Sequence, residues 1–341
     1  MHIPENYLSP SSCGVLGLAM VPVWAHCIKK VKNTMPREQI AYIGVFAAFS
    51  FLLMMFNIPL PGGTTGHAVG GTLIAILLGP EAACLAVSVA LIIQALMFGD
   101  GGVLAIGANC FNMAFVLPFL GFGIYRFIRD HAPAAWGDKV GAAIGSYVGI
   151  NAAALLAAIE FGIQPLLFTD GAGQALYCPY PLAISIPAMT IPHLLVAGVV
   201  EAIATVAIYS FVKKAAPDYI YQPADAQVGA SSHKSSLRPV YVLVAALVVL
   251  TPLGLLAEGT AWGEWGADEI ADVATAGQSL GYTPTGLSDG WSLETIMPDY
   301  ALSGMPDFVA YILSAVIGVA LLVIVFKVAA SFMSRRKVDP A

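Results

Sequence analysis

Residues 59–79, PLPGGTTGHAVGGTLIAILLG, decide the topology of the chain. The stretch begins as a loop rich in Pro and Gly and continues from His67 as a short apolar run. A helix needs about 20 apolar residues to cross a bilayer. The run over 67–79 is therefore either a short crossing or a re-entrant segment, and the choice reverses the orientation of everything that follows.

The composition is that of a polytopic membrane protein. Of 341 residues, 58% are hydrophobic and 11% are charged, and the mean hydropathy is +0.80. This is more apolar surface than a soluble core can hide. We expect an all-α fold with nine candidate spans, at about 13–28, 40–58, 67–79, 82–98, 103–125, 140–163, 184–212, 239–257 and 308–326.

The basic residues select the orientation. They fall in four groups, and with nine spans and the N-terminus outside all 15 lie on the cytoplasmic side, as positive-inside bias requires. Without a third span, Arg126, Arg129 and Lys139 would lie outside. We therefore keep 67–79 as a span and expect the preceding loop to dip into the membrane, where irregular backbone must be covered by protein or line a cavity. The groups are Lys29, Lys30, Lys32 and Arg37; Arg126, Arg129 and Lys139; Lys213, Lys214, Lys234 and Arg238; and Lys327, Arg335, Arg336 and Lys337.

The chain divides into two predicted membrane regions. Residues 216–237, rich in Ala, Ser, Pro and Gln, are typical of a cytoplasmic linker. It separates a seven-helix bundle over residues 1–215 from a two-helix region over 238–341. The latter has an acidic outer loop from Glu258 to Asp307, which either attracts cations or is simply an exposed acidic surface.

The N-terminal stretch Met1-His2-Ile3-Pro4 offers three nitrogens on two residues. The Met1 amine, the His2 amide nitrogen and a His2 ring nitrogen can close consecutive chelate rings, and planar nitrogen coordination suits Ni(II) or Cu(II). His67, predicted on the same outer side, is the candidate for the fourth nitrogen. No basic n-region precedes Lys29, so we expect the N-terminus to be retained, although most termini are frayed.

Other polar residues in the apolar runs have two open interpretations each. Asn109 and Asn112 share a helix face and either support the metal ligands or join helices. Gly66 lets backbone approach closely beside His67. His193 and Glu201, two turns apart, would form a proton relay or a transient ion site; we favour a role in helix association.

Small residues and absent motifs narrow the function further. Gly141, Gly145 and Gly149 predict a close helix contact, which we expect within this chain. No P-loop or HExxH motif is present, so ATP hydrolysis and zinc hydrolysis by the usual routes are excluded. The five cysteines form no CxxC pair and are expected to pack in the core. A net charge of −6 without a basic stripe gives no indication of nucleic-acid binding.

Four motifs stand out in the first part of the chain: MHIP at 1–4, PGGTTGH at 61–67, FGDGG at 98–102 and GANCFNMA at 107–114. Together they resemble the CbiM/NikM family, the substrate-binding (S) components of cobalt and nickel energy-coupling-factor (ECF) importers. The resemblance covers about residues 1–215, and Cys110 departs from it. Through PLGLLAEGT at 252–260, the C-terminal region resembles a fused NikN-like accessory component.

The resemblance implies a function and partners. It implies Ni²⁺ or Co²⁺ as transported substrate, bound by the Met1 amine, the His2 amide and ring nitrogens and the His67 ring. It also implies a transmembrane coupling subunit, cytoplasmic ATPase subunits and a place, among lipids, in the inner membrane of a prokaryotic cell. We expect a nickel-binding transport component; cobalt, a membrane metalloenzyme using His193 and Glu201, and a structural assembly subunit are the alternatives.

Overall fold

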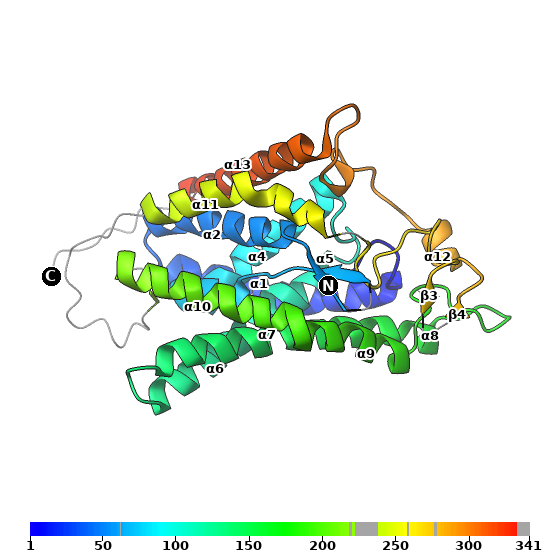
Figure 1. Ribbon diagram of the computed structural model, residues 1–341, viewed down its shortest axis with the longest axis horizontal. Coiled ribbons are helices and arrows are strands. Elements are labelled where there is room, and N and C mark those ends of the chain that lie inside the picture. Colours follow the sequence, from blue (N-terminus) through cyan, green and yellow to red (C-terminus); the bar gives the residue numbers. More distant parts are fainter. Residues whose placement is uncertain (62, 218–219, 222–237, 258, 276–277, 333–341) are drawn as a thin grey trace.

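The computed structural model describes residues 1–61, 63–217, 220–221, 238–257, 259–275 and 278–332, and its helices form one elongated bundle (Figure 1). Two short hairpins are the only paired strands in these ranges. The helices are α1 Pro10–Thr34, α2 Arg37–Met55, α3 Gly71–Leu78, α4 Pro80–Ile93, α5 Ile106–Asn109, α6 Leu117–His131, α7 Gly137–Gly162, α8 Gln164–Leu167, α9 Leu182–Pro192, α10 Gly198–Ala215, α11 Arg238–Leu250, α12 Thr285–Ser288 and α13 Asp307–Phe332. The strands are β1 Ile58–Leu60, β2 Thr64–Gly66, β3 Ala274–Thr275 and β4 Gln278–Ser279.

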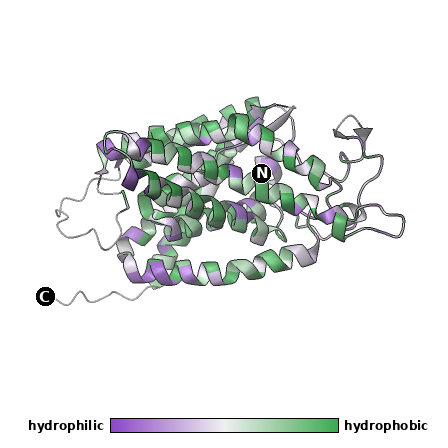
Figure 2. Ribbon diagram, turned by 90° about the horizontal axis from the view of Figure 1, so that it is seen from below, coloured by the Kyte–Doolittle hydropathy of each residue, from purple (hydrophilic) through white to green (hydrophobic). Residues whose placement is uncertain are grey.

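Among the described residues, seven helices are long and apolar enough to cross a membrane. The helix middles are hydrophobic and hydrophilic residues gather near the helix ends (Figure 2). The chain is thus a multi-pass membrane protein, as its composition predicts. The spans are Pro10–Thr34, Pro80–Phe98, Ile106–His131, Gly137–Leu167, Leu182–Ala215, Arg238–Leu256 and Asp307–Phe332, and Gln39–Met55 is a shorter apolar helix.

The third predicted span is only partly helical, which corrects the expectation of nine spanning helices. Helix α3 has 8 residues, about 12 Å at 1.5 Å per residue. The rest of the run is irregular chain from the β1–β2 hairpin to Gly70, which has a φ of +73°. The amide of Tyr221, beyond the end of α10, donates to Ile76 O. The segment therefore reaches the end of the bundle where α10 finishes.

In the part of the chain that the structure describes, three helices contain a π-helical turn, and π-turns often occur at functional sites. They are η1 Gln94–Phe98 after α4, η2 Cys110–Val116 after α5 and η3 His193–Ala197 after α9. Pro192 directly precedes η3 and has no amide hydrogen to donate, so the regular bonding of the helix changes there. Asn109 and His193, both singled out in the sequence, lie at the start of such turns.

The small-residue face of α7 packs against α6. A Cβ on Gly145 would lie 2.4 Å from Gly121 O, and one on Gly149 would lie 2.7 Å from Leu117 O. A Cβ on Gly141 would lie 2.8 Å from Tyr125 O. The helix that these glycines admit is thus in this chain.

The C-terminal region packs along α2. The Tyr311 hydroxyl on α13 donates to Met55 O at 2.8 Å, and a Cβ on Gly44 would lie 3.0 Å from Leu322 O. Between α11 and α13 the chain runs as a long loop over one end of the bundle (Figure 1). Most of the predicted linker 216–237, with Lys234, and the basic residues 335–337 lie outside the described residues.

Candidate metal centre

The N-terminal segment that precedes α1 is folded into the bundle. Met1 is 4% exposed and His2 is 2% exposed. Ile3 N donates to Asn109 Oδ1 at 2.8 Å, and Asn109 Nδ2 donates to Ile3 O at 3.0 Å. Gly102 N donates to the same carbonyl at 2.8 Å. These bonds hold the N-terminal segment in place, and of the two interpretations left open for Asn109 the contact with the N-terminal segment fits the first.

The loop after η1 holds the N-terminal segment closely because two of its residues lack a Cβ. A Cβ on Gly102 would lie 2.7 Å from the Glu5 backbone, and Gly101 has a φ of +86°. The Glu5 carboxylate accepts from Val103 N at 2.6 Å and from Leu104 N at 3.3 Å. Burial raises the pKa of Glu5 in spite of these donors. Loop and segment therefore fix each other.

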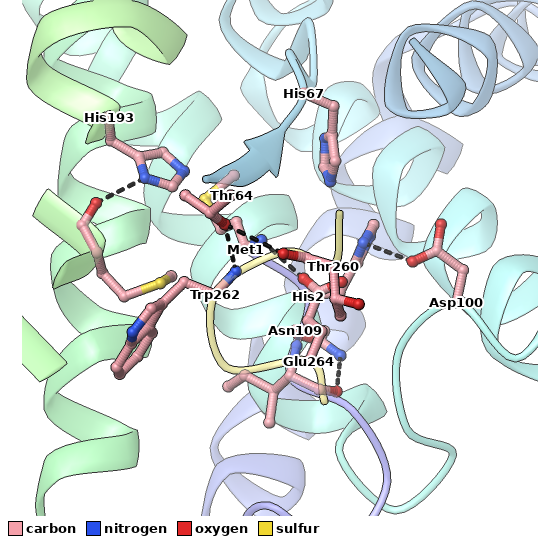
Figure 3. Close-up of polar contacts among 12 residues, drawn as sticks. Met1, His2, Thr64, His67, Asp100, Asn109, His193, Thr260, Trp262 and Glu264 are labelled. Carbon is pink, nitrogen blue, oxygen red and sulfur yellow. Dashed lines mark hydrogen bonds and ion pairs between the residues drawn. The ribbon is translucent and has the colours of Figure 1, made fainter. Parts of the chain in front are cut away.

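The structure brings His2 and His67 together, with ring centroids 4.8 Å apart and both residues buried (Figure 3). His67 Nδ1 is 3.2 Å from Ala68 O. A carbonyl oxygen only accepts, so in the neutral ring the hydrogen belongs to Nδ1 and the lone pair to Nε2. Among the described residues, neither His67 Nε2 nor His2 Nε2 has a hydrogen-bond partner. The lone pair of the buried His67 Nε2 is thus free to bind a metal ion.

Asp100 fixes the orientation of the His2 ring, with Oδ1 at 2.7 Å from His2 Nδ1. Burial acts to raise the pKa of Asp100, but the His2 ring, by charge and by hydrogen bond, and the nearby His67 ring outweigh it and hold the pKa below its ordinary value. The carboxylate also accepts from the Tyr300 hydroxyl and from Gln94 Nε2. The sequence does not predict that Asp100 contacts His2, although Asp100 lies in the FGDGG motif.

Glu201 positions the loop that carries His67. Its buried carboxylate accepts from Val69 N at 2.8 Å and from Gly70 N at 3.0 Å, where α3 begins. The anion satisfies amides at the helix start and suits the positive end of the helix dipole. A direct pairing of Glu201 with His193, the less favoured of the two interpretations of these residues, is not found among the described residues: His193 Nδ1 pairs with Met189 O instead.

Two further residues of the predicted site have other partners. Asn112 Nδ2 donates to Glu160 Oε2 at 2.8 Å, between η2 and α7, so it joins helices. Gly66 ends β2, and a Cβ there would lie 2.7 Å from Leu60 Cδ1 across the hairpin. Its small size thus permits the turn that leads into His67.

The loop between α11 and α13, which is the predicted outer loop of the C-terminal region, covers the N-terminal residues. The Met1 amine pairs with Glu264 Oε1 at 3.0 Å. Thr64 Oγ1 accepts from Trp262 N at 2.6 Å, and the Tyr7 hydroxyl donates to Trp265 O at 2.8 Å. Trp262 packs against Phe161, Tyr180 and Trp265. The acidic character of this loop is predictable from the sequence, but the pairing of Glu264 with the Met1 amine is not.

In the described part of the chain, no three His, Cys, Asp or Glu side chains are grouped as a metal site. Besides side chains, main-chain nitrogens can act as metal donors, and Met1-His2 presents an amine and an amide nitrogen beside the rings of His2 and His67.

Comparisons with known proteins identify the family of the chain. Residues 2–219 match the family model described as the cobalt uptake substrate-specific transmembrane region, and residues 238–335 match the PDGLE domain. The chain is 47% identical to the probable fused nickel transport protein LarMN of Lactiplantibacillus plantarum, over 96% of this chain and 97% of that one. It is 46% identical to the fused nickel transport protein NikMN of Rhodobacter capsulatus, over 95% of each.

A solved structure matches the first part of the chain. A crystal structure described as a truncated transition metal transporter covers 63% of this chain and 99% of that one, at 52% identity and a TM-score of 0.60. The chain belongs to the CbiM family, fused to a PDGLE domain, and is a membrane transport component of the prokaryotic ECF type and not an enzyme.

Proposed function

We propose that this chain binds Ni²⁺ as the substrate-specificity component of an ATP-driven importer, through the Met1 amine, the His2 amide and ring nitrogens and the His67 ring. The observation that carries the proposal is the burial of Met1 and His2 against His67, with the His2 and His67 ring centroids 4.8 Å apart. A chain terminus placed so deeply in a membrane bundle is exceptional, because termini are normally mobile.

The chelate chemistry defines what must move on binding. The amine and the amide nitrogen of consecutive residues close a five-membered ring with the ion. Of the His2 ring nitrogens, only Nδ1 then closes a small ring, and that atom pairs with Asp100. On binding, the metal ion would thus replace Asp100 as the partner of His2 Nδ1 and Glu264 as the partner of the Met1 amine. The Met1 amine, the His2 amide nitrogen and His2 Nδ1 must each release a proton to solvent when the ion binds, so affinity falls as pH falls.

Two observations favour nickel over cobalt. A planar set of nitrogens suits Ni(II), whereas Co(II) has no such preference for four in-plane donors. Relatives that match nearly the whole chain are named nickel transport proteins, whereas a cobalt transport protein CbiM of Lachnoclostridium phytofermentans is 36% identical over 38% of this chain. Competition calorimetry with the two ions tests the choice, and tighter binding of Co²⁺ would reverse it.

We further propose that residues 1–215 form the metal-binding part and residues 238–341 an accessory part. The chain would work with a transmembrane coupling subunit and cytoplasmic ATPase subunits, because its sequence contains no P-loop. Purification of the chain from its own membrane with those subunits attached tests this assignment.

Adding one residue before Met1 tests the proposed site directly. The extension converts the amine into an amide and lengthens a segment that has no room, so we expect Ni²⁺ binding to be lost in calorimetry. The control carries one extra residue after Ala341. N-terminal sequencing of both proteins verifies their first residues. Full affinity in the extended protein would refute the site.

A further inference from the structure

His193 is a third buried imidazole close to Met1. It opens the π-turn η3 and is 3% exposed. Its Nδ1 lies 2.7 Å from Met189 O, one turn earlier in the helix. Because that carbonyl only accepts, the hydrogen of the neutral ring belongs to Nδ1 and the lone pair to Nε2.

His193 Nε2 has no hydrogen-bond partner among the residues that the structure describes. Most buried polar atoms in proteins are paired, and a bare lone pair in an apolar bundle carries a cost. A ligand that fits beside the ring would satisfy this lone pair.

The free edge of the His193 ring faces Thr64 and Met1 (Figure 3). A cavity of about 10 Å³ lies between them, lined by Met1, Thr64, Thr65, His193 and Trp262 among others. That volume is about one water-sized group, and a single metal ion is of the same order. Glu201 is not among the lining residues, so the cavity offers an imidazole without a carboxylate.

We propose that His193 is a second metal-binding residue, whose Nε2 holds the ion in the cavity that it shares with Met1 while the ion moves to or from the Met1–His2–His67 site. The inference rests on the proposed function. Neutral imidazole is a ligand suited to Ni²⁺ and Co²⁺. Because Met1 lines this cavity and its amine belongs to the first position, the two positions adjoin. His193 thus lowers the barrier to exchange in both directions.

The first test measures Ni²⁺ exchange on the full chain, purified without a histidine tag. His193→Gln should slow both binding and release to a chelator by about tenfold, the lower end of the cost of losing a supporting group at a metal site. His131→Gln, at an exposed histidine on α6, is the matched control and should exchange at the wild-type rate. Wild-type rates in His193→Gln would overturn the proposal.

A second measurement leaves His193 intact and so does not depend on folding of the first variant. In His67→Ala, weakened Ni²⁺ binding should persist in calorimetry, because the cavity at His193 remains available. The double variant His67→Ala/His193→Gln should bind at least about tenfold more weakly than His67→Ala, with unchanged helices in circular dichroism. Equal affinities of the single and double variants would exclude His193.

The two hypotheses fail separately. If the protein extended before Met1 keeps full affinity, the proposed function falls. If that protein loses affinity while His193→Gln exchanges at the wild-type rate, only the role of His193 falls, and the residue is then a helix-packing histidine.

Discussion

Glu201 illustrates how one buried side chain positions another residue's metal-binding ring. Glu201→Gln keeps one acceptor oxygen but loses the charge that satisfies Val69 N and Gly70 N, which costs about 1–3 kcal/mol of stability. We expect a lower melting temperature and weaker Ni²⁺ binding, because the segment after His67 loosens. Asp130→Asn, at an exposed ion pair with Arg129, is the control. Melting and affinity equal to wild type would show that Glu201 does not position the loop.

At the residue scale, the candidate ligands could be predicted because their chemistry is local. Met1 and His2 are adjacent, and His67 shares a motif loop, so residue type and topology suffice to associate them. Asp100 and Glu264 could not be predicted to contact His2 and Met1, since these pairs form only when distant loops meet. The sequence identifies His193 and Glu201 as polar residues within apolar runs. Their hydrogen-bond partners depend on how the helices pack, which residue spacing does not predict.

At the scale of elements, the loop at residues 99–102 holds the N-terminal segment in place. In Gly102→Ala the new Cβ would lie 2.7 Å from Glu5 Cα and N, so backbone must move. We expect the helices to remain and Ni²⁺ affinity to fall by about 10- to 100-fold, as for other losses of support at metal sites. Calorimetry and circular dichroism measure the two properties.

Gly123→Ala is the matched control for Gly102→Ala, because a Cβ at Gly123 meets nothing within 4 Å. Gly123→Ala adds the same methyl group without displacing the loop at residues 99–102, so it should bind Ni²⁺ as wild type does. Equal affinity of the two variants would mean that the contact between loop and segment does not determine the site.

The third predicted span, residues 67–79, shows which features of an element could not be predicted from the sequence. Hydrophobic runs locate helices that meet lipid on one side, but α3 is buried at every residue and its length is set by its neighbours. The sequence predicted that the loop before His67 enters the membrane. How far the loop extends before a helix begins depends on the Glu201 carboxylate and on Gly70, which no hydropathy pattern encodes.

At the scale of the whole molecule, two regions far apart in sequence enclose one amine. The first region supplies Met1 and Thr64, and the outer loop of the second supplies Glu264 and the Trp262 amide. Because the two regions are fused, the loop of the second region stays beside the candidate site that it covers. The acidic loop is thus more than a diffuse negative surface, because one of its carboxylates is committed to the terminus.

Trp262 holds this cover in place, and its removal should expose the Met1 amine. Trp262→Ala loses ring contacts with Phe161, Tyr180 and Trp265, each worth about 0.5–1.5 kcal/mol, so transient opening should rise about tenfold or more. The measurement is the rate at which an amine-reactive acetylating reagent modifies Met1, followed by mass spectrometry of the N-terminal peptide. Trp291→Ala, in the same loop but 52% exposed, is the control and should react as slowly as wild type. Equal rates in both variants would mean that the burial of the amine depends on residues 1–215 alone, and the outer loop would then have no part in enclosing the site.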